Sequence, residues 1–147
     1  MDNNSQAVQG EIIDLKGKRI LVVDDVVTNR EILYLLLETS GATIDQAADG
    51  EEAVRMFSRN KYDLVFMDLH MPVMNGYNAT KNIRSLPLLW AISTPIISVS
   101  AESSVELHAK CRAVGINDHI SKPVATKDLY EKIAKWMPNA SGLGKAV

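Results

Sequence analysis

Residues 19–25 read RILVVDD, a short apolar run that ends in two neighbouring aspartates. A continuous apolar run of this length is typical of a central strand in a parallel sheet, because helices cover both faces of such a sheet. Polar side chains directly after such a strand lie at the carboxyl edge of the sheet, where open α/β sheets bind their ligands. The stretch therefore predicts both a buried strand and a polar site at its end.

Short apolar runs continue to alternate with longer helical patterns along the chain. Further strands are predicted over residues 43–47, 64–67 and 96–99, and around His119 and Ile120. The 43–47 segment mixes polar and apolar residues, which is typical of an edge strand. Because a turn signal follows each run, we expect five successive βα units on a parallel sheet.

The helix after the first strand is predicted to begin at Thr28, because Thr28 and Glu31 form a capping-box pattern. Ile32, Leu35 and Leu36 share one face of this helix and would pack on the sheet. Other helices are expected over residues 51–59, around Ala79 and Ile83 after the turn-rich residues 71–76, over 102–114 before Gly115, and over 126–136 before Pro138.

Composition limits the possible functions. Sixteen Lys plus Arg against eighteen Asp plus Glu give a net charge of -2, which offers no basic surface for nucleic acid or an anionic membrane. Cys111 is the single cysteine, so a reducing, cytoplasmic compartment is the default. The N-terminus lacks the order of a signal peptide, and no apolar run approaches the roughly 20 residues that span a bilayer.

The 147 residues suggest one domain. Residues 1–17 are predicted to be a flexible N-terminal arm or linker, residues 18–137 the domain, and residues 138–147 a C-terminal tail. Residues 85–94 (SLPLLWAIST) are more apolar than a surface loop should be. This segment, with Trp90 near its middle, either folds back over the sheet or presents a patch for a partner.

Polar residues follow four of the predicted strands at the same edge of the sheet. They are Asp24 and Asp25, Asp68, Ser100, and Lys122, which Pro123 follows. Each residue alone has an ordinary explanation as a turn, cap or solvated surface residue. Scattered charges would appear at both ends of the strands, however, so the shared position favours a common site.

Three carboxylates at one edge repel one another, which raises their pKa values unless a cation lies among them. Oxygen ligands with no competing His/Cys cluster suit Mg²⁺ better than zinc. With such a cation bound, a carboxylate can attack phosphorus and form an aspartyl phosphate. The lysine and the hydroxyl would then hold phosphoryl oxygens, because this transfer needs positioning and charge neutralisation more than a general base.

Four motifs at four successive strand ends resemble the receiver domain of bacterial response regulators, over about residues 18–137. The motifs are ILVVDD (20–25), MDLHMPVMNGY (67–77), ISVSA (97–101) and SKPV (121–124). The resemblance implies a flavodoxin-like (βα)5 fold with strand order 2-1-3-4-5. It also implies that a sensor histidine kinase or a histidine phosphotransfer protein donates a phosphoryl group, and that the domain signals to a downstream protein through protein contacts, as a monomer or weak dimer.

By this resemblance, Asp68 is the phosphoacceptor. Asp24 and Asp25 help to bind Mg²⁺, directly or through water, and the backbone carbonyl of His70 is a further metal ligand. The His70 side chain occupies a variable position of the family, so we expect it to modulate the reaction. No classical enzyme activity is expected of this chain alone beyond self-phosphorylation and autodephosphorylation.

Lys122 is implied to pair with the phosphoryl group, Ser100 to hydrogen-bond it in the active state, and Pro123 to be the family's cis-proline partner. Ser100 stands where threonine is commoner. His119 stands where the family usually has Tyr or Phe, the ring that turns inward on activation. A neutral His119 ring is expected to favour the inward, active position, unless the ring stays at the surface in both states.

Other classes fit less well. A flavin-binding protein of this fold needs a phosphate loop where this chain has Asp24 and Asp25, which would repel phosphate. An aspartate-based phosphatase usually has an acid two residues past its nucleophile, where this chain has His70. A non-phosphorylated docking module would not need the intact polar set. The sequence equally fits a free-standing regulator or the C-terminal receiver of a hybrid histidine kinase. Kinase activity is expected only in the second case.

Overall fold

The computed structural model describes residues 13–138, and the remaining parts of the predicted arm and tail lie outside the described residues. The elements in chain order are β1 (Arg19–Val23), α2 (Val27–Glu38), β2 (Thr43–Ala47), α3 (Gly50–Arg59), β3 (Leu64–Asp68), α4 (Gly76–Arg84), β4 (Ile96–Ser100), α5 (Val105–Val114), β5 (Asp118–Ser121) and α6 (Thr126–Trp136). All strand pairs are parallel, in the order β2-β1-β3-β4-β5. The predicted fold class and strand order are confirmed.

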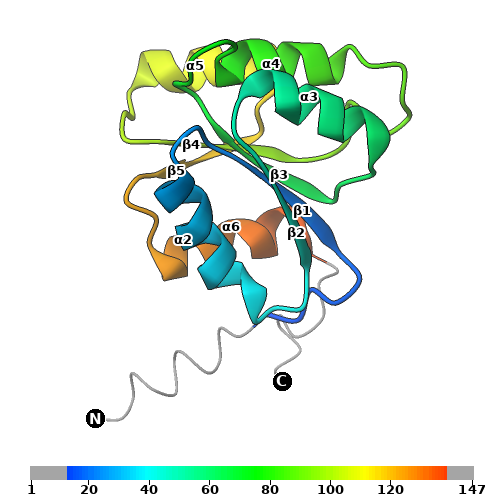
Figure 1. Ribbon diagram of the computed structural model, residues 1–147. Coiled ribbons are helices and arrows are strands. Elements are labelled where there is room, and N and C mark those ends of the chain that lie inside the picture. The colour runs from blue at the N-terminus through cyan, green and yellow to red at the C-terminus, as the bar shows by residue number, and fades with distance from the viewer. Residues whose placement is uncertain (1–12, 139–147) are drawn as a thin grey trace.

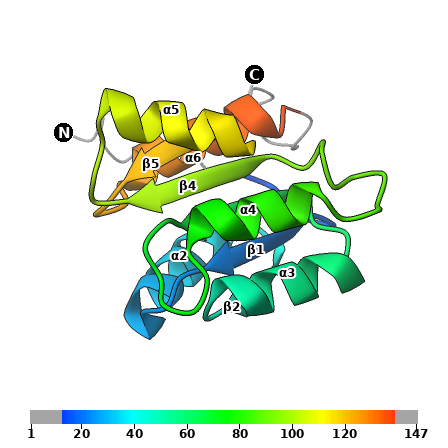
Figure 2. The same cartoon turned by 90° about the horizontal axis from the view of Figure 1, so that it is seen from above.

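Helices cover both faces of this sheet. Figure 1 shows α3, α4 and α5 on one face and α2 and α6 on the other, and Figure 2 shows the same layers from above. Each face has its own apolar cluster, because alternate residues of a strand point to opposite sides. Leu21 and Val65 belong to the cluster under α3, α4 and α5, whereas Ile20 and Phe66 belong to the one under α2 and α6.

Residues 13–17, which the sequence analysis assigned to the flexible arm, pack against the domain. Ile13 and Leu15 are buried in the cluster under α2 and α6. The backbone N–H of Leu15 donates to the carbonyl of Ser40 at 2.7 Å. The prediction failed here because two apolar residues separated by one aspartate are too short a pattern to stand out from a polar arm.

Helix α2 corrects two details of the prediction. The helix begins at Val27, so Thr28 lies inside it rather than at its N-terminal cap. The N-cap residue is Val26, whose side chain makes no capping hydrogen bond. Its buried residues are Leu33 and Leu37, whereas Ile32 and Leu35 are 44% and 62% exposed. The run ILYLLL is apolar all round, so helical spacing alone could not decide which face meets the sheet.

Helix α5 begins three residues later than predicted. The side chain of Ser104 accepts a hydrogen bond from the Leu107 N–H and so caps the helix before Val105. The helix ends as predicted at Gly115, whose φ of 101° lies in the left-handed region that favours glycine at a helix end. Residues 101–104 are therefore a loop that connects β4 to α5.

The apolar segment 85–94 folds back over the sheet only in part. Leu88 and Trp90 pack against the cluster under α3, α4 and α5, and Ala91 is fully buried. Leu89 is 92% exposed, so the packed interpretation is wrong for this residue, and Ile92 is 75% exposed as well. Across residues 13–138, no helix is long and apolar enough to cross a membrane.

Candidate functional site

The predicted acidic residues meet at the carboxyl edge of the sheet. Asp24 and Asp25 follow β1, and Asp68 is the last residue of β3, the strand that pairs with β1. Each of the three offers a carboxylate oxygen within 4.8 Å of the others. Asp24 and Asp68 are buried and Asp25 is exposed, so the cluster has a protected interior and one side open to solvent.

Lys122 reaches this cluster from the end of β5. Its Nζ lies 3.0 Å from Asp24 Oδ2 and 3.4 Å from Asp68 Oδ1. Burial alone would lower the pKa of Lys122, but the hydrogen bond and the charge of Asp24 and the charge of Asp68 outweigh it and raise that pKa. The peptide bond between Lys122 and Pro123 is cis. Lys122 is thus a charged partner held between two carboxylates.

The surroundings of Asp68 perturb its pKa strongly. Burial and, after it, the negative charge of Asp24 together raise its pKa from 3.8 to about 6, against the positive charge of Lys122, which lowers it. Three ionised carboxylates and one ammonium would leave a net charge of about -2 in the pocket, the charge that one divalent cation neutralises. All the donor atoms are oxygens, the ligands that Mg²⁺ prefers.

Asp24 is fixed by contacts that the sequence analysis did not identify. Its Oδ1 accepts the Val26 N–H at 2.9 Å and the Asn29 side-chain amide at 3.4 Å. Arg30 donates to the Asp24 backbone carbonyl at 2.8 Å from α2. The polar residues in the first turns of α2 could have indicated these contacts. Helix α2 begins just after the end of β1, so its first turns lie at the same carboxyl edge of the sheet as Asp24.

Gly76 is a second residue that the sequence analysis passed over, although the MPVMNG motif contains it. A Cβ atom at this position would collide with the backbone carbonyl of Asp68 and with Leu69. The Gly76 N–H also donates to the Leu69 carbonyl at 3.1 Å. The start of α4 therefore lies directly against the end of β3, which only glycine permits.

His70 and Ser100 flank the acidic cluster. The His70 N–H lies 3.4 Å from Asp68 Oδ1, and the exposed His70 ring makes a 3.4 Å pair with Glu102 Oε1 across the loop after β4. Ser100, the buried last residue of β4, accepts the Glu102 N–H on its Oγ at 3.0 Å. Both residues thus lie at the predicted edge, on strand ends next to Asp68.

His119 lies away from this cluster, on β5 and toward α5. Its Nδ1 is 2.7 Å from Ser98 Oγ, and its ring centroid is 5.1 Å from that of His108. The ring is half-buried in this structure. The Ser98 and His108 contacts were not foreseen, because spacing along the chain cannot pair a strand residue with a helix residue across the layer.

The comparisons with known proteins agree with this geometry. The family model of the response regulator receiver domain matches residues 20–134. Hybrid signal transduction histidine kinase B of Dictyostelium discoideum is 36% identical over 129 residues, covering 82% of this chain and 7% of that protein. The CAI-1 autoinducer sensor kinase/phosphatase CqsS of Vibrio cholerae is 37% identical over 120 residues, covering 82% of this chain and 17% of its own length.

Solved structures show the same fold. The receiver domain of sensor histidine kinase PA1611 from Pseudomonas aeruginosa, described with a magnesium ion in its active site cleft, has a TM-score of 0.76 and 32% identity over 84% of this chain and 99% of its own. The receiver domain of Ssk1 from Saccharomyces cerevisiae, crystallised with the histidine phosphotransfer protein Ypd1, has a TM-score of 0.74 and 29% identity. That match covers 83% of this chain and 90% of its own.

The family assignment rests on three agreeing findings. The described strands have the same order and direction as predicted, and the acidic residues meet at the edge where the motifs placed them. The family model covers most of the chain. The chain belongs to the response regulator receiver domain family of two-component phosphorelay systems.

Proposed function

We propose that Asp68 accepts the phosphoryl group in this phosphorelay. The observation that carries the proposal is a buried carboxylate, Asp68, beside two further carboxylates and the Lys122 ammonium at one sheet edge. The Asp68 oxygen forms a bond to phosphorus as the bond from phosphorus to the donor histidine nitrogen breaks, and that nitrogen leaves with its electron pair. Because the attacking group is an ionised carboxylate, no general base is required.

The pocket has the ligands that a Mg²⁺ ion needs. Asp24, Asp25 and Asp68, with the backbone carbonyl of His70, would hold the ion, which supplies charge neutralisation for the phosphoryl oxygens. Lys122 would bind another phosphoryl oxygen, since its ammonium already lies 3.4 Å from Asp68. The Ser100 hydroxyl would donate to the same group from β4.

Intact mass after incubation with acetyl phosphate tests the phosphoacceptor. The wild-type chain should gain one phosphoryl group in the presence of Mg²⁺ and none in excess chelator. Asp68→Asn should abolish the gain, whereas Glu131→Gln, the same chemical change at an exposed position of α6, should leave it unchanged. Labelling that persists in Asp68→Asn or in chelator would refute the proposal.

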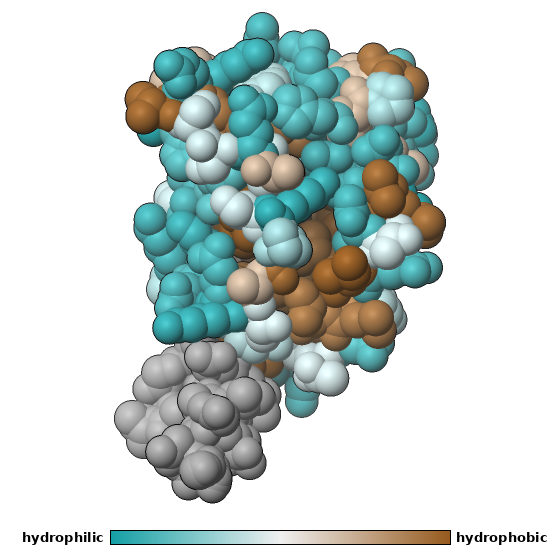
Figure 3. All heavy atoms as spheres, turned by 90° about the vertical axis from the view of Figure 1, so that its left-hand side faces the viewer, coloured by the Kyte–Doolittle hydropathy of each residue, from teal (hydrophilic) through white to brown (hydrophobic). Residues whose placement is uncertain are grey.

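A protein donor would dock on the exposed apolar side of α2. Val26, Val27, Ile32 and Leu35 are between 44% and 62% exposed. Ile32 also lines an apolar groove of about 450 Å³ that reaches Asp24 and Lys122. Figure 3, which looks onto the carboxyl ends of the strands, shows an apolar area beside a hydrophilic one on this face. Exposed apolar patches of this kind are typical of protein-binding sites.

Replacement of Leu35 separates docking from chemistry. Leu35→Glu should slow phosphotransfer from a phosphorylated histidine phosphotransfer protein by roughly tenfold or more, since a charge would face the apolar partner surface. Phosphorylation by acetyl phosphate should not change. Leu89→Glu, at the 92% exposed residue of the 85–94 segment, is the matched control. Equal rates for the two variants with the protein donor would place docking elsewhere.

The relatives favour a second context for the same chemistry. The chain spans between 7% and 17% of the length of the curated relatives it matches, which include hybrid histidine kinases. The domain would then be the receiver of a longer cytoplasmic kinase rather than a free-standing regulator, and its output would still pass to a downstream protein through contacts. The length of the native gene product decides between these contexts.

A further inference from the structure

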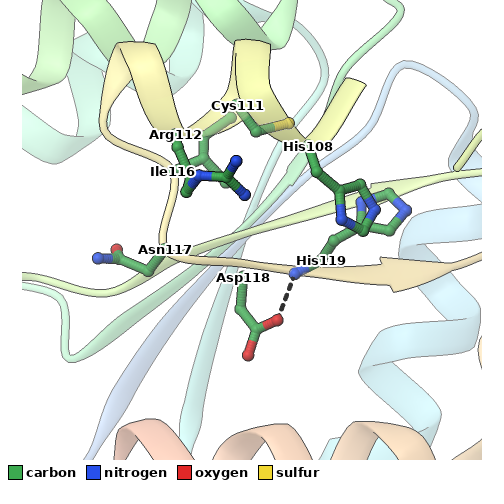
Figure 4. A pocket seen from close by; sticks show the side chains of 7 residues that line it. All are labelled: His108, Cys111, Arg112, Ile116, Asn117, Asp118 and His119. Atoms are coloured by element: carbon green, nitrogen blue, oxygen red, sulfur yellow. Dashed lines mark hydrogen bonds between the residues drawn. The ribbon is translucent and has the colours of Figure 1, made fainter. Parts of the chain in front are cut away.

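A pair of histidines lies behind the acidic pocket, between β5 and α5. His119 and His108 have ring centroids 5.1 Å apart, with ring planes tilted by 50°. Both line a cavity of about 100 Å³ together with Cys111, Arg112 and Asp118, and Figure 4 shows the two rings next to each other at one side of it. None of these residues belongs to the phosphoryl-transfer site described above.

The hydrogen bonds around Ser98 indicate which nitrogen of His119 carries the proton. Ser98 Oγ has one proton to donate, and the Asp118 carbonyl lies 3.3 Å away to accept it. Ser98 Oγ then accepts from Cys111 Sγ at 3.8 Å and from His119 Nδ1 at 2.7 Å. His119 Nε2 is left with a lone pair, and it is buried with no hydrogen-bond partner among residues 13–138.

A proton on Nε2 would be costly in these surroundings. It would place a charge on a half-buried ring, at a nitrogen that makes no hydrogen bond within the described residues. Burial lowers the pKa of His119, and the neighbouring His108 lowers it further. The neutral ring therefore fits the site, and the charged ring does not.

Charged groups face the ring from each element packed against it. His108 and Arg112 approach from α5, and Lys132 of α6 also disfavours a second positive charge. The Glu102 backbone in the β4–α5 loop and the Asp118 carboxylate favour the charged ring. The Asp118 carboxylate, however, is already engaged by Lys132 at 3.0 Å and by the Trp136 Nε1–H at 2.8 Å.

The loop after β4 connects this pair to the Asp68 pocket. At its start, Ser100 Oγ accepts the Glu102 N–H at 3.0 Å. At its end, Ser103 Oγ lies 3.2 Å from His108 Nε2. A Ser100 that moves toward a phosphoryl group on Asp68 would therefore pull on the loop that holds His108. Ser98 and Ser100 are also two residues apart on one strand, so both face the same side of the sheet.

We propose that His108 and His119 form a two-histidine proton sensor on the β5–α5 face, in which protonation drives the His119 ring away from Ser98 and lowers the population of the phosphorylated, active conformation. The inference rests on the proposed function of Asp68. Linkage makes the effect reciprocal: if acid opposes the active conformation, then adopting that conformation must make His119 harder to protonate.

NMR of the imidazole nitrogens in the full chain tests the sensor. Spectra in Mg²⁺ are recorded from about pH 8 to about pH 5, with and without beryllofluoride as the phosphoryl mimic. We expect the Nδ1–H tautomer of His119, a titration midpoint below the ordinary value of about 6.5, and a further decrease on beryllofluoride loading. A midpoint near about 6.5 that is the same in both states would overturn the proposal.

Two variants separate the pair from the fold. His108→Gln should raise the His119 midpoint, because it removes the neighbouring ring that lowers the pKa of His119, while leaving the chain intact. His119→Phe should remove the pH dependence of the loaded fraction, measured from the amide shifts of β5. An unchanged pH profile in His119→Phe would refute the regulatory role even if the chain is labelled normally by acetyl phosphate. Failure of acetyl phosphate labelling would instead refute the role of Asp68. The titration of His119 in the unloaded protein does not depend on that role, so the two failures can be distinguished.

Discussion

Val73 adopts a left-handed backbone conformation with φ of 70°, alone among the non-glycine residues that the structure describes. The Met74 N–H donates to the Pro72 carbonyl at 2.7 Å, so Val73 is the central residue of a γ-turn. A β-branched side chain crowds this conformation, and at 76% exposure the Val73 side chain gains little packing in return. The loop that follows the phosphoacceptor is therefore strained at one residue.

Val73→Gly is expected to stabilise the protein. Relief of the strain should exceed the added flexibility of glycine in the unfolded chain, for a net gain of roughly 0.5–1 kcal/mol in the free energy of unfolding. Urea denaturation measures it. Leu89→Gly, at an exposed residue without a positive φ, should be neutral or destabilising. A loss of stability in Val73→Gly as large as that in Leu89→Gly would show that residue 73 is not strained.

At the residue scale, the sequence was sufficient to predict those site residues that lie at the carboxyl ends of strands. Asp24, Asp25, Asp68, Ser100 and Lys122 all lie at the ends of predicted strands, so their common edge followed from the parallel topology. The contacts of Arg30, Gly76 and Ser98 could not be predicted in the same way. Each depends on how closely two elements approach, and a linear pattern carries no such distance.

At the scale of elements, α2 shows where periodicity loses information. Strand positions were predictable because β1, β3 and β4 are short apolar runs with turn signals on both sides. Helix α2 has apolar residues on every side, so packing against the sheet decided that Leu33 and Leu37 turn inward. The residues left outside, Ile32 and Leu35, are the ones that the proposed docking face uses.

Arg84 joins three elements at the opposite edge of the molecule. From the end of α4, its guanidinium donates to the carbonyls of Ala91, Thr94 and Gly115 at 2.7 to 3.1 Å, and to Asn117 Oδ1 at 2.9 Å. Burial lowers the pKa of this guanidinium. The side chain thereby holds the apolar 85–94 segment and the start of β5 in place.

Arg84→Ala should lower the free energy of unfolding by roughly 2–3 kcal/mol, because several part-buried carbonyls lose their donor. Thermal and urea denaturation measure the loss. Lys81→Ala, at an exposed position of the same helix, should change stability by less than about 0.5 kcal/mol. Equal effects of the two substitutions would show that the Arg84 contacts contribute no net stability.

Asp118 joins β5 to α6 in a comparable way. Burial alone would raise its pKa, but hydrogen bonds from Trp136, Lys132 and the His119 backbone outweigh burial and lower the pKa to about 2. Because the folded pKa lies below the unfolded one, the stabilisation is complete above about pH 4 and decreases as pH falls toward about 2. The carboxylate therefore anchors the C-terminal helix at neutral pH.

Asp118→Asn should reduce the free energy of unfolding near neutral pH by roughly 1–2 kcal/mol and flatten its decrease between about pH 4 and about pH 2. Urea midpoints at a series of pH values measure both effects. Lys135→Ala removes the more exposed partner, 3.4 Å from Asp118, and should leave the acid limb in place. An unchanged acid limb in Asp118→Asn would assign that limb to other carboxyl groups.

At the scale of the whole molecule, the carboxyl edge of the sheet brings negatively charged side chains together, and their burial and repulsion destabilise the fold. Burial and the negative charge of Asp24 together raise the pKa of Asp68 to about 6. Because the folded pKa lies above the unfolded value, the folded state is favoured below about pH 4 and loses stability as pH rises through about 6. The cost at neutral pH is roughly 2–3 kcal/mol, and one Lys122 ammonium cannot neutralise three carboxylates.

Removal of divalent cations should therefore weaken the whole domain in a pH-dependent way. In chelator, the unfolding midpoint of the wild type should decrease as pH rises from about 4 to about 7, and Mg²⁺ should restore it by mass action. Asp68→Asn should be more stable than the wild type in chelator and show a flat pH profile, because the buried charge is gone. Asp25→Asn should keep the pH dependence of Asp68, since Asp25 is exposed, but respond more weakly to Mg²⁺. The wild type could instead be equally stable at pH 7 in chelator and in Mg²⁺. That result would mean that Lys122 and solvent already neutralise the pocket, and that the acidic residues do not lower the stability of the fold.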